Sequence, residues 1–321
     1  MKILVTGGLG FIGSHTVVEL SNKGYECVIV DNLALGSRET FGRMQKISEY
    51  PIRCRNINLL DREQLADVFK QNRFDAVIHL NESRAVDESM ENPLVRHEDM
   101  INSTANLLEE MKKADVKRII YSSSIPARKD TTSFGWNPYD HTNSIVEEML
   151  YDLSHLDPKW RVSVLKYTTP VGAHSSGMIG DEPGGIPTNL LSSIAMAANG
   201  GEVVVDVPGE PSLMGFIHVT DLANAHDKAL KYLIRNAGSR TLNVGTGKGY
   251  SALEVIHMFE EVNEVKIPYQ IVDKYLEDFA MNCIDSSEAE NELDWKAERG
   301  LREMCEDTWR WEKESKRLLM G

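Results

Sequence analysis

The chain has 321 residues, of which 41% are hydrophobic and 26% are charged. This balance is typical of a globular protein with a large core, and the length allows one large domain or a main domain with a smaller lobe. The formal net charge of −14 excludes long-range attraction to nucleic acid or to an anionic membrane, because the field of the protein repels phosphates. The sequence contains no run of about 18 apolar residues, the length needed to span a membrane. The apolar run at its start is too short for the core of a signal peptide.

The cysteine pattern indicates an intracellular protein. Cys27, Cys54, Cys283 and Cys305 are scattered and form no Cys-x-x-Cys pair. Such a pattern is typical of reduced thiols in an intracellular protein, whereas a disulfide is the less favoured interpretation. We therefore expect a cytoplasmic protein.

The first half of the chain alternates short apolar runs with helical patterns. Strands are predicted at Lys2–Thr6, Cys27–Asp31, Ile52–Leu59, Asp75–His79, Arg118–Ser122 and Arg161–Lys166. Helices are predicted at Phe11–Lys23, after an N-cap at Asp61, at Pro93–Ala114 and at Tyr139–Ser154. Strands that are separated by helices of this length predict an α/β fold with a parallel sheet.

The regular alternation of predicted strands and helices ends after Pro170. A loop rich in glycine and proline is expected at Ser175–Pro187, and the acidic run Glu277–Glu292 is expected to be a solvated surface. The remaining predicted elements are helices at Pro187–Asn199, Thr220–Arg235, Ser251–Val262 and Leu301–Arg317 and strands at Glu202–Asp206 and Arg240–Val244. We expect residues 1–170 to form the main domain and residues 171–321 to form mostly a smaller α+β lobe on the carboxyl edge of the sheet, with some segments returning to the main domain.

A glycine-rich turn follows the first predicted strand. It reads Gly7-Gly8-Leu9-Gly10-Phe11-Ile12-Gly13, and Asp31 ends the second strand. A lone Gly-x-Gly-x-x-Gly is a weak signal, but in this strand–turn–helix–strand context it predicts a Rossmann-type, doubly wound dinucleotide site. The pyrophosphate would lie at the positive end of the helix. Asp31 would accept hydrogen bonds from the adenosine ribose and repel a 2′-phosphate, which favours NAD over NADP.

Several further segments carry a resemblance in order and spacing. They are Asp31-Asn32-Leu33, Val77-Ile78-His79, Ser122-Ser123-Ser124, Asn137-Pro138-Tyr139, Pro170-Val171-Gly172-Ala173-His174, Gly185-Ile186-Pro187-Thr188-Asn189-Leu190, Ile217-His218-Val219-Thr220-Asp221-Leu222-Ala223, Asn243-Val244-Gly245-Thr246-Gly247 and Asp307-Thr308-Trp309-Arg310-Trp311. With the glycine turn, they cover nearly the whole chain. The sequence resembles the UDP-glucose 4-epimerase family of extended short-chain dehydrogenases/reductases.

The resemblance implies a mechanism and a set of site residues. Tyr139 would take the proton of the sugar 4-hydroxyl while tightly bound NAD accepts the hydride, and Ser124 would hydrogen-bond the reacting oxygen. The cofactor-binding residues would be Gly7, Gly10, Phe11, Ile12, Gly13, Asp31, Asn32, Asn58, Leu59, Leu80, Arg84, Tyr139 and Tyr167. The UDP-sugar would contact Ser124, Thr169 and Asn189. The resemblance also implies a homodimer that pairs through the helices at Pro93–Ala114 and Tyr139–Ser154.

The sequence departs from this family at the catalytic pair. The family has a lysine four residues after the tyrosine, where this chain has Asn143. Residues i and i+4 share one helix face, so the lysine charge would stabilise the tyrosinate. Tyrosine titrates near about 10, and a neutral amide supplies no such field. His141 lies on another face, and Lys129, in the preceding loop, leaves a rescue open.

The substrate pocket also departs from the family pattern. Met214 and Tyr275 stand where the family has diphosphate-binding arginines, and Thr169 replaces an asparagine. Asn58 replaces the aspartate at the adenine, and Leu80-Asn81-Glu82-Ser83-Arg84 differs beside the nicotinamide. The loops Ile125–Trp136 and Val207–Leu213 look shorter than those of the family. Charge-assisted contacts contribute roughly 1.5–3 kcal/mol each, so these changes predict weakened substrate binding.

Two hypotheses follow. The chain is either an NAD-binding epimerase homologue that has lost most or all turnover and acts in binding, sensing or scaffolding, or a working UDP-hexose epimerase or related sugar-nucleotide enzyme with compensating residues. We favour the first. Simpler interpretations stand beside both: Tyr139 as an ordinary first-turn residue, Ser122–Ser124 as a strand end, and His79 and His218 as structural histidines. No metal-ligand spacing is seen, so no metal site is predicted.

Overall fold

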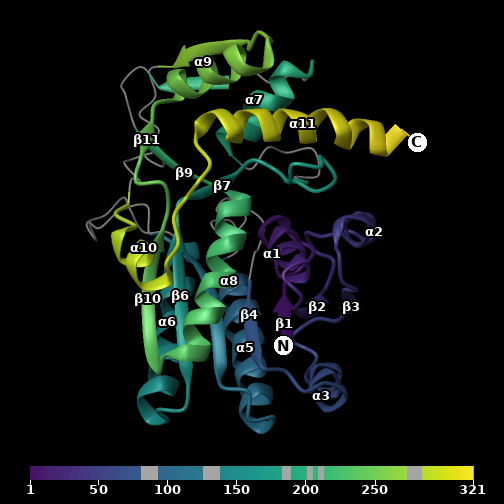
Figure 1. The fold of residues 1–321 in the computed structure, drawn as a ribbon, viewed down its shortest axis with the longest axis vertical. Helices are drawn as coiled ribbons and strands as arrows, with labels where there is room; N and C mark the ends of the chain where they lie inside the picture. Colours follow the sequence, from purple (N-terminus) through teal and green to yellow (C-terminus); the bar gives the residue numbers. More distant parts are fainter. Residues whose placement is uncertain are drawn as a thin grey trace.

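The computed structural model describes residues 1–80, 93–125, 138–182, 189–200, 205–208, 213–272 and 284–320 (Figure 1). The strands are β1 Lys2–Thr6, β2 Glu26–Asp31, β3 Arg53–Asn56, β4 Ala76–His79, β5 Arg118–Ser124, β6 Arg161–Tyr167, β7 Thr169–Val171, β8 Val205–Pro208, β9 Met214–His218, β10 Gly238–Val244, β11 Gly249–Tyr250 and β12 Tyr269–Val272. The helices are α1 Phe11–Asn22, α2 Arg38–Ile47, α3 Arg62–Gln71, α5 Pro93–Lys113, α6 Pro138–Leu156, α7 Leu190–Ala198, α8 Val219–Arg235, α9 Ala252–Asn263, α10 Ser287–Leu293 and α11 Leu301–Met320.

A seven-stranded parallel sheet forms the centre of the main domain. Its strand order is β10-β6-β5-β4-β1-β2-β3. The chain runs outward from β1 to β3 and then returns to the other side of β1, so the order reverses between β1 and β4. Ligands of doubly wound sheets bind at the carboxyl edge beside such a reversal. The predicted α/β Rossmann fold is confirmed.

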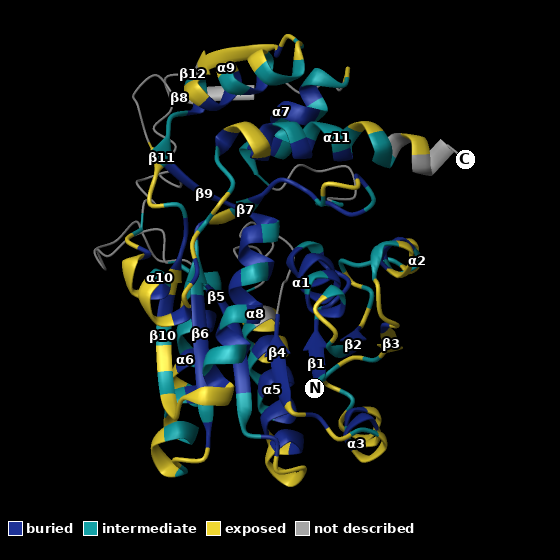
Figure 2. Cartoon of the chain, in the orientation of Figure 1, coloured by how far each residue is buried: buried dark blue, intermediate teal, exposed yellow. Residues whose placement is uncertain are grey.

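Helices cover both faces of this sheet. On one face α1 and α8 pack together, and their apolar side chains join those of β1 and β2 in one buried core. On the other face α3, α5 and α6 pack over β4 and β5 in a second core. Figure 2 shows the central strands as continuously buried, which accounts for their uninterrupted apolar sequences.

A smaller lobe lies beyond the carboxyl ends of the strands (Figure 1). It contains the three-stranded sheet β11-β9-β7 and the two-stranded sheet β12-β8. Helices α7, α9 and α11 surround a third core that includes Phe216, Phe259 and Met304. The smaller lobe therefore covers the carboxyl edge of the main sheet, where the dinucleotide site is expected.

The structure corrects several details of the sequence prediction. The strand expected at Arg240–Val244 is β10, which pairs with β6 at the edge of the main sheet rather than in the smaller lobe. Helix α2 was not predicted, and β3 is shorter than expected. Within the run Glu277–Glu292, α10 buries Ala289 against α8 and β10, so that part is not merely a solvated surface. In the described residues, no helix combines the length and apolarity needed to cross a bilayer.

Candidate functional site

The glycine-rich turn brings three backbone segments into contact at the end of β1. Gly7 has a φ of +64°, and a Cβ atom there would lie 2.2 Å from the carbonyl oxygen of Leu80, which follows β4. A Cβ atom at Gly13 would lie 2.1 Å from the carbonyl oxygen of Gly7. Only glycine permits these approaches. The turn therefore holds the start of α1 directly over the point where the strand order reverses.

The start of α1 and the end of β2 form the features that a dinucleotide requires. Gly10 is the N-cap of α1 without a side-chain cap, and the first turn carries no acidic residue, so the positive end of the helix can accept a pyrophosphate. The Asp31 carboxylate accepts hydrogen bonds from the backbone N–H groups of Leu9 at 2.9 Å and Leu33 at 2.8 Å. Burial raises the pKa of Asp31, and these N–H groups oppose that shift. The residues present fit NAD.

The other predicted cofactor residues follow the same edge. Asn32 and Asn58 are exposed. The side-chain oxygen of each accepts a hydrogen bond from the backbone N–H two residues later, that of Ala34 or Leu60. Leu59, Leu80 and Tyr167 lie after β3, after β4 and at the end of β6. Phe11 and Ile12 open α1, whereas Arg84 lies outside the described residues. Contact of these residues with NAD remains a prediction.

Four side chains at the end of β5 and the start of α6 form a chain of hydrogen bonds. The Tyr121 hydroxyl donates to Oδ1 of Asn143 at 2.8 Å, and Nδ2 of Asn143 donates to Oγ of Ser124 at 3.1 Å. The Ser124 hydroxyl donates to Oδ1 of Asp140 at 3.0 Å. Asn143 is 4% exposed, and half-buried Tyr139 lies one turn before it. The residue at the expected lysine position is therefore a buried, neutral amide.

The two preceding serines of β5 have different partners. The Ser122 hydroxyl lies 3.0 Å from the Tyr167 hydroxyl, to which it donates, and 3.2 Å from Nε2 of His226. Burial lowers the pKa of His226 to about 4, so its imidazole is neutral near pH 7. These contacts fix Tyr167, a predicted cofactor-binding residue, against the strand end.

An ion pair borders the same strand end. The Ser123 hydroxyl donates to Glu147 at 2.6 Å, and Glu147 forms an ion pair with Lys166 at 2.8 Å. Lys166 therefore has a carboxylate partner of its own on α6. The serine run does more than end a strand, because each member links the sheet to a helix or to a neighbouring strand.

The predicted substrate residues lie on the smaller lobe. Thr169 is exposed on β7. Asn189 is the N-cap of α7, where its side chain accepts from the Ser192 N–H, and its Nδ2 lies 3.4 Å from the Asp181 carboxylate. Asn189 and Phe11 line one small hollow between α1, α7 and α11. A predicted cofactor residue and a predicted substrate residue thus face the same space.

Of the two positions where the family pattern predicts an arginine, the structure describes Met214 but not Tyr275. Met214 is 7% exposed and packs in the apolar core of the smaller lobe with Phe216 and Met304. Tyr275 and Lys129 lie outside the described residues. His141 is exposed, and its ring lies 5.7 Å from that of His97. Met214 therefore makes apolar contacts, and its match to a cation of the family pattern stays a prediction from the sequence.

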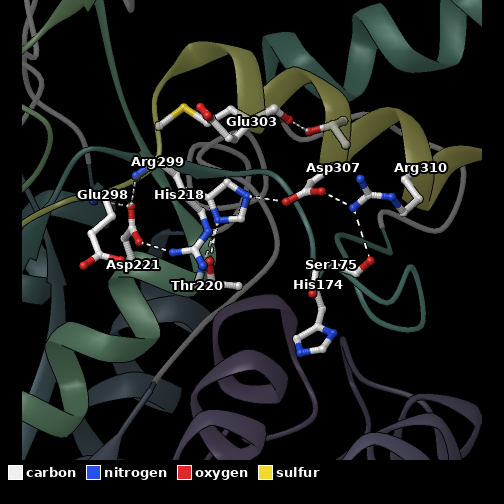
Figure 3. Close-up of polar contacts among 12 residues, drawn as sticks. His174, Ser175, His218, Thr220, Asp221, Glu298, Arg299, Glu303, Asp307 and Arg310 are labelled. Atoms are coloured by element: carbon white, nitrogen blue, oxygen red, sulfur yellow. Dashed lines mark hydrogen bonds and ion pairs between the residues drawn. The ribbon is translucent and has the colours of Figure 1, made fainter.

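Polar contacts that Figure 3 shows in close-up link the end of β9 and the start of α8 to α11 and the segment before it. Nε2 of His218 lies 3.2 Å from the Asp307 carboxylate, which also pairs with Arg310. Asp221 pairs with Arg299 and accepts its backbone N–H at 2.8 Å. His218 therefore has a structural role, as predicted. His79 also does, because both of its ring nitrogens lie within 3.0 Å of the hydroxyls of Thr6 and Thr104.

Sequence reasoning missed two features of the site. It passed over Asp140, although an acidic residue directly after the candidate tyrosine was visible in Tyr-Asp-His-Thr-Asn. It also missed the ion pair between Arg43 of α2 and Glu182, which no local pattern indicates. Among the described residues, no three His, Cys, Asp or Glu side chains are grouped to hold a metal ion.

The parallel sheet with its glycine turn and terminal aspartate defines a dinucleotide-binding protein of the Rossmann class. The family model of the NAD dependent epimerase/dehydratase family matches residues 3–245. The chain is 42% identical to UDP-glucose 4-epimerase of Bacillus subtilis over 97% of both chains, and 40% identical to that of Haemophilus influenzae over 98% of both. The chain belongs to the UDP-glucose 4-epimerase family, within the NAD-dependent epimerases and dehydratases.

Solved structures agree with this assignment. A UDP-glucose 4-epimerase from Stenotrophomonas maltophila, with bound NAD and formylated UDP-arabinopyranose, superposes with a TM-score of 0.94 at 36% identity over 99% of both chains. The enzyme from Bifidobacterium longum, in complex with NAD+ and UDP, gives a TM-score of 0.91 at 37% identity over 98% of this chain and 99% of that one. NAD is thus the cofactor of this protein.

Proposed function

We propose that this protein binds NAD and a UDP-hexose but interconverts UDP-galactose and UDP-glucose very slowly or not at all. The observation that carries the proposal is the state of Asn143, which is buried and hydrogen-bonded to Tyr121 and Ser124. In the family pattern, the cation at this position stabilises the tyrosinate that accepts the substrate proton. Each unit by which a tyrosine pKa must be lowered corresponds to about 1.4 kcal/mol, and a neutral amide supplies none of it through charge.

The substrate side supports the same proposal. A buried methionine at position 214 offers no charge to a diphosphate, and desolvating phosphate charges without a cationic partner is unfavourable. The binding energy of the UDP portion also orients the sugar for reaction, so its loss lowers the rate as well as the affinity. Weak binding and slow turnover are therefore expected together.

A UDP-sugar is nevertheless the ligand that the site favours. The hollow beside Phe11 and Asn189 adjoins the dinucleotide turn, and structural neighbours of high similarity contain UDP or a UDP-sugar. Binding without efficient turnover fits a protein that senses a sugar nucleotide or presents it to a partner.

A working epimerase is the second candidate. It is favoured by identities of 38–42% over nearly the full length of relatives that are named UDP-glucose 4-epimerase. In that case compensating residues would replace the missing lysine. The related possibility is an enzyme that acts on a different sugar nucleotide.

The deciding experiment uses the purified protein with its bound cofactor. UDP-galactose is added, and UDP-glucose formation and the absorbance of NADH are followed together, with UDP affinity measured by calorimetry. We expect UDP binding with turnover far below the ordinary enzyme rate of roughly 10 per second. Turnover at that ordinary rate would establish the working epimerase instead.

We also propose that two copies pair through α5 and α6. These helices pack side by side on one face of the sheet, and Leu94 and Val95 at the start of α5 are 80% and 58% exposed. Exposed apolar groups of this kind favour burial against a partner. Light scattering during gel filtration is expected to give twice the chain mass, and Leu94→Asp with Val95→Asp is expected to give a monomer.

A further inference from the structure

The hydrogen-bond chain Tyr121–Asn143–Ser124–Asp140 has a defined direction. An ionised carboxylate can only accept, so at the 3.0 Å contact the Ser124 hydroxyl must be the donor to Asp140. Ser124 in turn accepts from Nδ2 of Asn143, and Oδ1 of Asn143 accepts from the Tyr121 hydroxyl. Every donor in the chain points toward Asp140. The proton of Ser124 is therefore already directed to a carboxylate.

Asp140 lies where a negative charge is stabilised. It is the acidic residue in the first turn of α6, a 19-residue helix. Carboxylates are favoured at this end of a helix by its dipole, and a hydrogen bond from Ser124 favours the ionised form further. Asp140 is half-buried, so the sheet edge and not bulk solvent surrounds much of it. The site thus holds a carboxylate that accepts a hydrogen bond from Ser124 at the favourable end of a helix.

Tyr139 has the opposite setting. The residue one turn after it is the neutral Asn143, and the residue next to it in the chain is the anionic Asp140. A nearby anion disfavours the ionisation of a phenol, just as a nearby cation favours it. Of the two groups that open α6, Asp140 is the one that already accepts the hydroxyl of Ser124.

We propose that Asp140, acting through Ser124, is the proton acceptor for the hydroxyl of a sugar nucleotide at this site. The inference rests on the proposed function, because it requires a UDP-hexose beside NAD. It assigns to Asp140 a task that the family pattern gives to a tyrosinate. Asp140 does not touch the substrate in this scheme and is a positioning residue whose partner, Ser124, makes the contact.

The step balances. The sugar hydroxyl passes its proton to Oγ of Ser124, and the hydroxyl proton of Ser124 passes to Oδ1 of Asp140. The carbinol hydrogen leaves with its electron pair to the nicotinamide of NAD+. An alcohol becomes a ketone, NAD+ becomes NADH, and a carboxylate becomes a carboxylic acid. A carboxylate is a much weaker base than a tyrosinate, which is consistent with slow turnover.

The test measures the first half of the reaction. UDP-galactose is mixed with the NAD-loaded protein, and the rate of NADH formation is recorded between about pH 5 and pH 9. If Asp140 is the acceptor, the rate is constant above about pH 6, because an aspartate with an ordinary pKa near 4 is fully ionised there. If Tyr139 is the acceptor instead, with an ordinary phenol pKa near 10, the rate would rise about tenfold per pH unit toward that pKa.

Variants separate a proton acceptor from a structural residue. Asp140→Asn is expected to slow NADH formation at least tenfold while NAD content, UDP affinity and the thermal midpoint stay unchanged, and Asp140→Glu is expected to restore part of the rate. Asp152→Asn, an exposed position on the same helix, is the matched control. The infrared carboxylate band that is lost in Asp140→Asn reports the charge of Asp140 without any substrate, and it is expected to show an ionised group at pH 7.

Each other outcome overturns the inference. Wild-type rates in Asp140→Asn would do so, as would a tenfold rise per pH unit that disappears in Tyr139→Phe. If wild type binds UDP but forms no NADH, the inference fails while the proposed function stands. If wild type turns over at ordinary rates, the proposed function fails, and the pH profile with Asp140→Asn still decides the role of Asp140.

Discussion

Nδ2 of Asn143 donates a hydrogen bond to Oγ of Ser124 at 3.1 Å, so two residues to which the family pattern assigns separate tasks are joined to each other. This contact determines what can be expected from a repair of the tyrosine–lysine pair. A lysine at position 143 would regain a charge but would lose the amide contacts to Ser124 and Tyr121.

Asn143→Lys is expected to leave UDP-galactose turnover at least a hundredfold below the ordinary rate of roughly 10 per second. The Tyr121 hydroxyl, in a fully buried side chain, would lose its hydrogen bond to Asn143, and a hydrogen bond contributes about 0.5–1.5 kcal/mol. The measurements are steady-state conversion and the free energy of unfolding.

The matched control for this variant combines Asn143→Lys with Tyr121→Phe, which removes the hydroxyl that donates to Asn143. Stability is expected to recover in the double variant while turnover stays low. Substantial turnover in Asn143→Lys alone would mean that the phosphate pocket is intact, and the defect would then reduce to one residue.

NAD is expected to bind at least tenfold more tightly than NADP, a difference of about 1.4 kcal/mol. The buried Asp31 carboxylate would repel a 2′-phosphate and hydrogen-bond the free ribose hydroxyls. Asp31→Ser is expected to weaken NAD binding about tenfold, since hydrogen bonds to charged groups contribute roughly 1.5–3 kcal/mol. Calorimetry on cofactor-free protein measures both, with the exposed Asp67→Ser as control. Equal affinity for the two cofactors in wild type would contradict the role given to Asp31.

The sequence allowed good prediction of the dinucleotide half because its signals are local. β1 matches its predicted bounds, and α1 and β2 differ by a single residue at one end, since glycines and an acidic strand end mark these boundaries within a few residues. The helix after the N-cap at Asp61 was found for the same reason. Local chemistry decides such boundaries, so one sequence is sufficient.

Features that depend on distant partners could not be predicted. β10 pairs with β6 across more than 70 residues, and its alternating burial resembles that of any short strand. Helix α2 carries few buried side chains, and one of them is Arg43, which a hydrophobic pattern treats as surface. The partner of Asn143 comes from β5, so its neutral hydrogen-bonded state is visible only in three dimensions.

Met214→Arg is expected to destabilise the protein by about 2–3 kcal/mol rather than to rebuild a phosphate site. Met214 is 7% exposed within an apolar core, and a guanidinium there would be desolvated without a designed partner. Met214→Leu, which conserves volume, is the matched control and is expected to cost less than about 1.5 kcal/mol. Denaturant unfolding measures both. A stable Met214→Arg protein with improved UDP affinity would show that this side chain can reach the ligand.

Asp227→Asn is expected to lower stability at neutral pH by about 1–3 kcal/mol. Burial opposes ionisation of this carboxylate, but hydrogen bonds from Lys23 at 2.6 Å and Lys231 at 2.7 Å prevail and lower its pKa. A carboxyl with a depressed folded-state pKa stabilises the fold above its unfolded pKa, and the stabilisation is lost as the pH falls through the folded value.

The difference between wild type and Asp227→Asn should therefore shrink in acid below about pH 4. Urea unfolding at a series of pH values measures it. Asp67→Asn, which breaks the exposed pair with Lys70, is the control and should change stability by less than about 1 kcal/mol. A difference that stays constant with pH would exclude ionisation of Asp227 as the cause.

The last prediction concerns the link between α2 and the smaller lobe. Arg43 is buried, forms an ion pair with Glu182 and lies 5.4 Å from the centre of the Trp311 ring. Thr40 donates to the same carboxylate at 2.9 Å. Because α2 follows the segment after Asp31, the pair with Glu182 and the contact with Trp311 tie the adenosine side of the cofactor site to the loop after β7 and to α11.

Glu182→Gln leaves the Arg43 charge buried without its partner, so it is expected to cost about 1–3 kcal/mol and to speed the release of NAD. Arg43→Met alone removes the buried guanidinium charge and leaves the Glu182 carboxylate, which is partly solvated. This variant should therefore lose less stability than Glu182→Gln. The double variant is expected to be more stable than the sum of the singles implies, by roughly 0.5–3 kcal/mol, as for residues in direct contact. Arg38→Met, on an exposed position of the same helix, is the matched control. Unfolding free energies and the rate of NAD loss on dilution measure the coupling, and strictly additive effects in both would show that the two side chains do not act as a pair.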